Sequence, residues 1–295
     1  MKHIFLINRF SLKHRTDKMV DTIKKVCKRR KMDFAIEINN NSFSTEDTIN
    51  KYKHTKHIIY AIGGDGTLNR VMHSVIKTKN IFSYIPYGSG NDFNRSAKEL
   101  LHEGINDIDL IKINDMYCMN VTCFGIDADI ANQGIDSTSK WIPRSQKYNA
   151  IIVSQFLHFK PKEFKLTCHG EVIEDNFSTI IACNGRYYGA GYHPNPEGSL
   201  DDHIMDIYMI EAMSKASLIK YIIKMKQGKL DNSVKARHIR TDKLTIETKN
   251  EIVANVDGEK LPGSKFDLKI IKKGLSIYYD PDLINEILDE MKKKK

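Results

Sequence analysis

The run Ala61–Asn69 constrains the fold of this chain more than any other part of the sequence. Its letters, AIGGDGTLN, follow the apolar segment His57–Ile62 and open a segment in which apolar residues recur at intervals of three and four. This order predicts a strand, a glycine turn and the start of an amphipathic helix. Glycines let a ligand approach the backbone, and the N-terminus of a helix attracts phosphate. The run therefore predicts an anion-binding turn.

Two further features make this site more specific. Asp65 lies inside the turn, where its carboxylate would repel phosphate unless a cation such as Mg²⁺, which prefers oxygen ligands, lies between them. A second glycine turn, Gly88–Phe93 (GSGNDF), follows the next apolar strand, one strand–helix unit later. A single Gly-x-Gly is usually an ordinary turn, but the two together indicate a site for a magnesium nucleotide. The chain lacks Gly-x-x-x-x-Gly-Lys-Ser/Thr, so it is not a P-loop protein.

The chain changes character near residue 115. Before this point strands and helices alternate, which predicts a doubly wound, Rossmann-like parallel sheet with ligands at the carboxyl ends of its strands. After it short strands dominate, which predicts an antiparallel β-sandwich. We therefore expect an α/β nucleotide-binding domain over residues 1–117, a β-rich lipid or substrate domain over 118–275, and a C-terminal helix over 276–295.

The same periodicities predict individual elements. In the first domain we expect strands at 3–8, 34–38, 57–62 and 82–85, with helices at 18–31 and from Ser44, where a capping sequence begins. In the second domain we expect strands at 119–124, 164–168, 179–183, 207–211, 236–239, 244–247, 252–256 and 266–271. Further helices are expected at 147–159, 215–227 and 281–295.

Positive charge is concentrated near the N-terminus. The chain of 295 residues has a net charge of +9, and residues 1–60 hold 14 Lys or Arg against 6 Asp or Glu. The cluster Lys24–Lys31 and the terminal Lys292–Lys295 suit an anionic membrane surface, the alternative being solvated helix faces. The basic run has no interleaved aromatic residues, so nucleic acid is not expected. Without a signal peptide or an apolar run of roughly 18 residues, we expect a cytoplasmic protein that associates peripherally with membranes.

Five motifs together carry a family resemblance. Gly63–Thr67 with Pro86–Phe93 resembles the catalytic domain of diacylglycerol kinases and related bacterial lipid kinases. Three later stretches follow the pattern of the same family in the same order: Phe124–Ala128, Asn184–Asp202 and Val256–Glu259. The first motif alone is shared with NAD kinases, whereas the set of five is far more specific. The resemblance spans nearly the whole chain and implies that its end returns to the first domain.

The resemblance implies an ATP-dependent lipid kinase. Such an enzyme transfers the γ-phosphoryl group of ATP to a lipid hydroxyl, of diacylglycerol or a similar lipid, and uses Mg²⁺. Asp65 would engage the catalytic Mg²⁺ through water. The nucleotide would be held by two groups of residues, Gly63, Gly64, Asp65, Gly66, Thr67, Leu68 and Asn69 in the first turn and Gly88, Ser89, Gly90 and Asn91 in the second.

The resemblance also assigns a base. Glu259, in the Asp-Gly-Glu motif, would take the proton of the acceptor hydroxyl, and Asp257 lies two residues before it. Two nearby carboxylates can raise the pKa of one while the other stays ionised. The alternative is a hairpin turn, because Asp-Gly is a strong turn dipeptide. The Asp-Gly-Glu residues taken alone favour the hairpin turn. The other four motifs of the family favour the catalytic role.

A third acidic position departs from the family pattern. The family holds a structural Mg²⁺ that maps to the Asp202 side chain and the backbone of Ser199 and Ile204. This chain has His203 where the family has glycine, and a positive φ there would be less comfortable for histidine, although histidine tolerates it. Arg70 likewise stands where the family usually has glutamate.

Two other functions remain open from the sequence. The family's first strand usually ends in Asn-Pro, whereas this chain has Asn8-Arg9. The departures at Arg9, Arg70 and His203 suit a catalytically weak or inactive regulator that binds nucleotide or lipid. NAD kinase shares the first motif but not the second or the Asp-Gly-Glu ending. The sequence does not identify the acceptor among diacylglycerol, phosphatidylglycerol, a polyprenol and a sphingoid base, and a homodimer rests only on analogy with the family.

Overall fold

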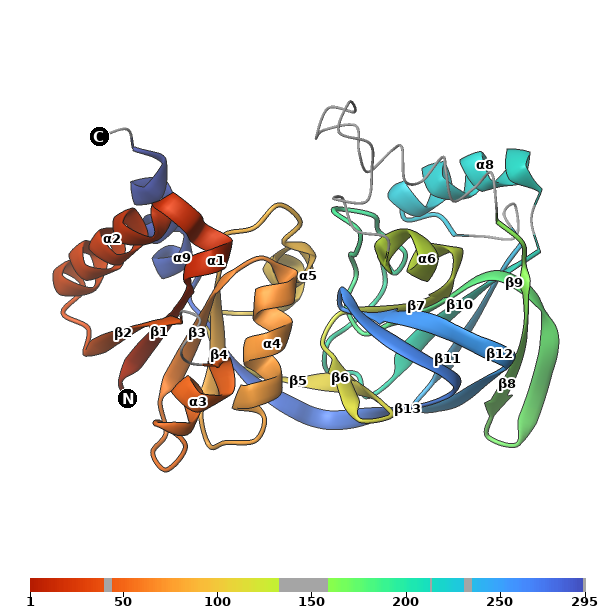
Figure 1. Ribbon diagram of the computed structural model, residues 1–295, viewed down its shortest axis with the longest axis horizontal. Coiled ribbons are helices and arrows are strands. Elements are labelled where there is room, and N and C mark those ends of the chain that lie inside the picture. Colours follow the sequence, from red (N-terminus) through yellow and green to blue (C-terminus); the bar gives the residue numbers. More distant parts are fainter. Residues whose placement is uncertain (40–43, 133–158, 213, 231–234, 294–295) are drawn as a thin grey trace. The chain divides into compact units, whose positions relative to one another are not determined.

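The computed structural model describes residues 1–39, 44–132, 159–212, 214–230 and 235–293 (Figure 1). The chain divides into two compact units, unit 1 formed by Met1–Ile108 with Lys273–Lys295 and unit 2 formed by Asp109–Lys272. The expected domain boundaries at residues 117 and 275 fall inside strands β6 and β13, respectively. Strands β5 (Gly104–Ile113) and β13 (Glu259–Tyr279) run from one unit into the other.

Unit 1 contains a parallel sheet. Its strands are paired in the order β4-β3-β1-β2, and the end of β13 pairs with β4 in parallel through Ile277 and Phe82. Every residue of β3 and β4 is buried, which explains why both read as continuous apolar runs. The four strands span β1 His3–Asn8, β2 Phe34–Asn39, β3 Ile58–Gly63 and β4 Ile81–Pro86.

Four helices of unit 1 form two packed pairs. Helix α2 packs on α9 and α3 packs on α4, and the two pairs lie on opposite sides of the strands (Figure 1). The capping sequence predicted at Ser44 is present, with reciprocal bonds between Ser44 and Asp47. The helical elements are α1 Arg9–Leu12, η1 Lys13–Arg15, α2 Thr16–Arg29, α3 Thr45–Asn50, α4 Asp65–Val75, α5 Asp92–Leu100 and α9 Pro281–Lys292.

Unit 2 is rich in antiparallel strands. Strand β9 pairs with β7, β8 and β10, and β12 pairs with β7, β8 and β13. Its core includes Phe124, Phe164, Phe177 and Phe266. The further elements are β6 Met116–Cys118, β7 Val121–Gly125, α6 Ile126–Asn132, β8 Lys162–Cys168, β9 Glu171–Cys183, β10 Met205–Glu211, α8 Lys215–Lys226, β11 Ala236–Thr241 and β12 Lys243–Val256.

Some element predictions need correction. The expected strands at 244–247 and 252–256 are parts of the single strand β12, whose register against β13 shifts between Glu247 and Ile252. The polar residues between them break the apolar pattern without ending the strand. The final helix ends at Lys292 rather than at 295, and the expected helix at 147–159 lies outside the described residues, except for its last position.

Candidate functional site

The two glycine turns of unit 1 lie against each other. Strands β3 and β4 are neighbours with Gly63 opposite Pro86, so both turns leave the same end of the sheet. The Tyr87 N–H donates to the Gly63 carbonyl over 2.8 Å. A Cβ atom on Gly88 would lie 2.3 Å from the Cα atom of Gly64, closer than real Cβ atoms come. The contact between the turns therefore requires glycine at position 88, independently of any ligand.

The first turn leads into α4 without a side-chain cap. The helix begins at Asp65, and its N-cap is Gly64, whose carbonyl accepts the N–H groups of Thr67 (2.9 Å) and Leu68 (3.1 Å). N–H groups that precede these have no partner within a helix, and the helix dipole adds positive charge there. A Cβ atom on Gly66 would meet no heavy atom within 4 Å, so there is space beside the turn. This end of α4 can receive a phosphate group.

The second turn leads into α5, whose N-terminus is already occupied by a carboxylate. Asp65 accepts the N–H of Asp92 at Oδ2 (3.1 Å) and the N–H of Phe93 at Oδ1 (3.2 Å). A Cβ atom on Gly90 would lie 2.9 Å from Asp65 Oδ2, which explains the glycine at that position. Because a protein anion already holds the start of α5, the two turns have different roles despite their similar sequences.

Asp65 retains the capacity to accept further bonds. A carboxylate offers about four acceptor positions, and the two backbone N–H groups use one on each oxygen. The neighbouring Asp92 is paired with Arg95 Nη1 at 2.6 Å, so its charge is balanced locally. Asp65 is only partly buried. Its position fits the predicted contact with a water of a magnesium nucleotide.

The remaining nucleotide residues differ in what their side chains can reach. Asn91, at φ 56°, holds the second turn through its side-chain amide. Its Oδ1 accepts the N–H of Gly88 (3.1 Å), and its Nδ2 donates to the carbonyl of Gly88 (3.0 Å). Leu68 and Asn69 are 1% and 2% exposed, whereas Ser89 is exposed. The two adjacent turns bring together the predicted set: Gly63, Gly64, Asp65, Gly66, Thr67, Leu68, Asn69, Gly88, Ser89, Gly90 and Asn91.

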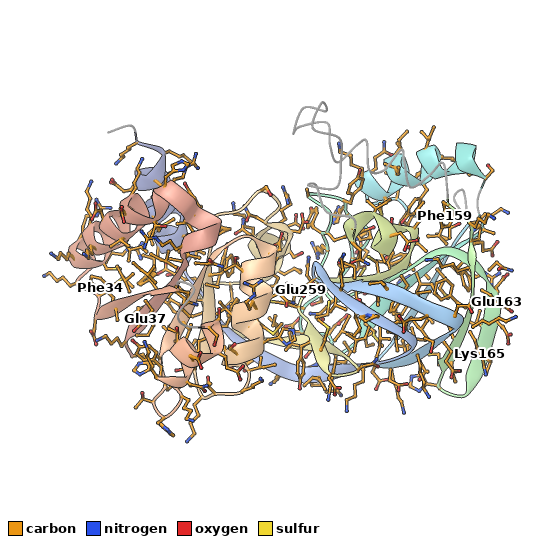
Figure 2. All side chains as sticks on the ribbon, viewed as in Figure 1. Phe34, Glu37, Phe159, Glu163, Lys165 and Glu259 are labelled. Carbon is orange, nitrogen blue, oxygen red and sulfur yellow. The ribbon has the colours of Figure 1, made fainter. Side chains whose placement is uncertain are left out.

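In unit 2, the Asp-Gly-Glu motif forms a tight hairpin. Val256 pairs with Glu259, so the β12–β13 turn contains two residues, Asp257 at φ 48° and Gly258 at φ 95°. Positive φ at both positions is the geometry for which Asp-Gly is favoured in hairpins. Glu259 is the first residue of β13, at the end of the hairpin, and it is partly exposed (Figure 2).

The Asp257 carboxylate is directed at backbone rather than at Glu259. It accepts the N–H groups of Met119 (2.5 Å), Asn120 (3.1 Å) and Val121 (2.9 Å), which lead into β7. Burial raises the pKa of Asp257, and these backbone hydrogen bonds act against that rise. The two acidic residues of the motif thus have different surroundings, and Asp257 fixes the hairpin that carries Glu259.

One buried carboxylate has a role that the sequence did not indicate. Asp127, in the family's Gly-x-Asp-Ala segment, lies on α6 and accepts bonds from the hydroxyls of Thr179 (2.9 Å) and Tyr221 (2.6 Å). Burial raises the pKa of Asp127, and the two hydroxyl bonds act against that rise. Asp127 therefore joins α6 to β9 and α8, and the motif itself was the only signal for it.

The predicted metal loop contains an ion pair. Asp202 Oδ2 is paired with the guanidinium of Arg240, and Asp202 Oδ1 accepts the N–H of Ile204 over 3.3 Å. The hydroxyl of Ser199 donates to Asp201 over 2.6 Å. Over the described ranges, no group of three or more His, Cys, Asp or Glu side chains is arranged to hold a metal ion. Both oxygens of Asp202 thus have protein partners, and the Mg²⁺ site expected at Asp202 with the backbone of Ser199 and Ile204 stays a prediction.

His203 takes the conformation expected of the family's glycine. Its φ is 65°, so this position takes the positive φ that would be less comfortable for histidine than for glycine. Its N–H donates to Asp109 Oδ2 over 2.7 Å, and its Nδ1 lies 3.0 Å from the same oxygen. Asp109 is 1% exposed. The histidine thus adopts a positive φ and is a hydrogen-bond partner of a buried carboxylate.

Two family descriptions match this chain in succession. The diacylglycerol kinase catalytic domain matches residues 2–118, and the YegS C-terminal NAD kinase beta sandwich-like domain matches residues 120–278. A structure described as a diacylglycerol kinase from Bacillus anthracis has a TM-score of 0.71 at 18% identity, covering 96% of this chain and 98% of that one. At this identity the likeness establishes the fold, an α/β unit followed by a β-rich one.

Curated relatives carry kinase names. A protein of Staphylococcus carnosus named "Putative lipid kinase" is 27% identical over 238 residues, which cover 75% of this chain and 76% of that protein. A protein of Shewanella frigidimarina named "Probable lipid kinase YegS-like" is 23% identical, with 75% of each chain covered.

Proposed function

The chain belongs to the diacylglycerol kinase catalytic-domain family of bacterial lipid kinases, and from this premise we propose that it transfers the γ-phosphoryl group of ATP to a lipid hydroxyl. The acceptor would be diacylglycerol or a similar lipid, and the reaction would serve phospholipid metabolism. The observation that carries this proposal is the asymmetry of the glycine turns, which leaves the start of α4 for phosphate while Asp65 holds the start of α5.

Unit 1 would supply the nucleotide site. The backbone N–H groups at Gly64–Gly66 and the dipole of α4 would hold phosphate oxygens. Mg²⁺, when bound with ATP, neutralises charge on the transferred group. Asp65 would hold a water of that ion with its remaining acceptor positions. The open space beside Gly66 allows close approach to the backbone.

Unit 2 would supply the base. Glu259 would accept the proton of the lipid hydroxyl as its oxygen attacks the γ-phosphorus, the bond from that phosphorus to the β–γ bridging oxygen breaks, and ADP leaves. Asp257 would not take part in proton transfer, because three backbone N–H groups engage its carboxylate. It would act as a positioning residue for the hairpin.

A second candidate is a nucleotide- or lipid-binding regulator without turnover. Arg70 is exposed on α4, one turn from the proposed phosphate site, where the family usually has glutamate. NAD kinase activity is a less favoured third candidate, because the second glycine motif and the Asp-Gly-Glu ending belong to the lipid kinases.

The test is transfer of radiolabelled phosphate from ATP into total cell lipid. Wild type is compared with Glu259→Ala and with a matched control, Glu163→Ala, which alters an exposed glutamate on β8 (Figure 2). A labelled lipid that persists in the control and disappears in Glu259→Ala supports the proposal and identifies the acceptor by mass. ATP binding without label in any lipid favours the regulator, and formation of NADP from NAD favours the third candidate.

A further inference from the structure

Helix α8 is anchored in unit 2 by one face. Its N-cap Ser214 accepts the N–H of Ser217, and the side chains of Tyr221 and Met225 are buried. The Tyr221 hydroxyl donates to Asp127 over 2.6 Å, and Met225 packs in the same apolar cluster. These contacts fix which side of the helix faces outward.

The outward side of α8 presents two large apolar residues. Ile219 and Ile223 are 62% and 51% exposed and are separated by four positions, so they lie one above the other on the same helix face. In the described parts of the chain four other large apolar side chains are exposed, and no two of them share a helix or strand: Met1, Ile38, Ile105 and Val172. The α8 pair is therefore a local apolar patch and not scattered exposure.

The segment that carries this patch is basic. Residues 212–230 contain five lysines and no aspartate or glutamate. Lys220, Lys226 and Lys229 are exposed. An apolar strip flanked by lysines, without acidic residues, matches an anionic bilayer in two ways, since the lysines suit lipid phosphates and the isoleucines suit the acyl boundary.

The basic patch predicted near the N-terminus is different. Several of its cations pair with acidic residues on or just before α9, within unit 1. The pairs are Lys25–Glu290 (2.8 Å), Arg29–Glu286 and Arg30–Asp280 (3.1 Å). These contacts account for much of that charge within the fold.

We propose that the outer face of α8 docks on an anionic bilayer, with Ile219 and Ile223 inserted below the headgroups. This inference rests on the proposed function, because a lipid kinase must reach hydroxyls at a membrane surface. A second copy of this face is a poorer occupant, since a symmetric contact would place two lysine-rich, acid-free segments against each other. Among the described residues, no helix is long and apolar enough to cross a membrane.

The test is sedimentation of the full chain with vesicles of phosphatidylcholine alone or with about 30% phosphatidylglycerol. Wild type is expected to bind the anionic vesicles at least about tenfold more tightly. The double variant Ile219→Ser/Ile223→Ser is expected to lose at least about tenfold in affinity, and the matched control Val172→Ser, at an exposed position on β9, is expected to bind like wild type. Equal binding by the double variant and wild type overturns the inference.

A charge-reversal pair separates α8 from the N-terminal patch. Lys226→Glu/Lys229→Glu is expected to weaken anionic binding several-fold, whereas Lys24→Glu/Lys28→Glu, at exposed positions on α2, is expected to have little effect. The reverse result places the membrane contact on α2 and overturns the inference. So does a dimer in analytical ultracentrifugation that the serine substitutions dissociate, because the face would then bind a second copy.

The design distinguishes failure of this inference from failure of the proposed function. Vesicle binding needs no turnover, so it reports on α8 even if no lipid is ever phosphorylated. If the chain is a kinase, Ile219→Ser/Ile223→Ser should keep wild-type turnover on a dispersed short-chain diacylglycerol and lose it on the same lipid in anionic vesicles. Equal loss on both substrates indicates damage to the fold and is checked against the thermal midpoint.

Discussion

Asp65-Gly66 and Asp257-Gly258 are the same dipeptide, one in each unit, with different outcomes. In unit 1 the dipeptide opens α4, and the Asp65 carboxylate reaches two N–H groups at the start of α5. In unit 2 it forms a hairpin turn, and the Asp257 carboxylate accepts the N–H groups of Met119, Asn120 and Val121, where β7 begins. The first carboxylate has two N–H partners and retains acceptor positions, whereas the second is engaged by three N–H groups. The same two residues therefore open a helix beside the proposed ligand site in one place and brace a hairpin in the other.

The largest effect is expected from removal of the brace. Asp257→Ala leaves three N–H groups without their acceptor, and we expect a loss of about 3 to 5 kcal/mol in the free energy of unfolding. Asp257→Asn keeps one carbonyl oxygen and should cost less. Urea unfolding measures both, and a loss below about 1 kcal/mol in the alanine variant would contradict the structural role.

Two glycine substitutions, one in each turn, test the packing of the turns and the proposed phosphate site. Gly88→Ala places a Cβ atom 2.3 Å from Gly64 Cα, so we expect about 1–3 kcal/mol of destabilisation from the displaced turns. Gly66→Ala meets no atom within 4 Å and should leave stability unchanged or slightly higher, yet weaken ATP binding, because the methyl group occupies the space for phosphate. Calorimetric titration with Mg-ATP gives the affinity. Wild-type affinity in Gly66→Ala would contradict the proposal that phosphate binds at this turn.

The Asp65 carboxylate is expected to contribute less to stability than Asp257. Asp65→Ala removes the cap of α5, at a cost of about 1 kcal/mol. Asp65→Asn keeps one acceptor and much of this stability but removes the negative charge, so the Mg²⁺ concentration that supports half-maximal ATP binding should rise. If this Mg²⁺ concentration is unchanged in Asp65→Asn, Asp65 does not act on Mg²⁺ and has only a structural role, like that of Asp257.

The smallest effect is a pH dependence. Burial raises the folded-state pKa of Asp257 above the 3.8 of an ordinary aspartate. The Asp257 carboxyl therefore holds its proton more tightly in the folded chain than in the unfolded chain. The stabilisation that protonated Asp257 gives to the folded state is fully present below pH 3.8. It is lost as the pH rises through the raised pKa, by at most about 1.4 kcal/mol per pH unit. The unfolding free energy of wild type relative to Asp257→Asn should decline over this range. A rise with pH would show that the backbone hydrogen bonds outweigh burial.

Local patterns in the sequence predicted much of the fold. The apolar runs of β3 and β4, the cap at Ser44 and the two glycine turns each depend on neighbours within a few residues. The sequence left open whether position 203 has a positive φ, and the histidine adopts one. Elements whose identity depends on their surroundings were missed, such as α6 directly after β7.

The partners of charged side chains could not be predicted in the same way. Asp65 meets the start of α5 across 27 positions, and Asp202 meets Arg240 across 38. No pattern in the neighbouring residues indicates either contact, because both form when separate elements pack together. The sequence therefore identified residues of the predicted turn and metal loop, but the roles of Asp65 and Asp202 depended on what folded beside them.

The course of the chain through unit 1 has a consequence for biosynthesis. The last strand pair of its sheet, β13 with β4, and the packing of α9 on α2 both use residues after 272. During synthesis from the N-terminus, β4 and α2 leave the ribosome long before these partners exist, whereas all of unit 2 is made before them. Unit 1 therefore stays incomplete until residues 273–292 have been synthesised, after the last residue of unit 2.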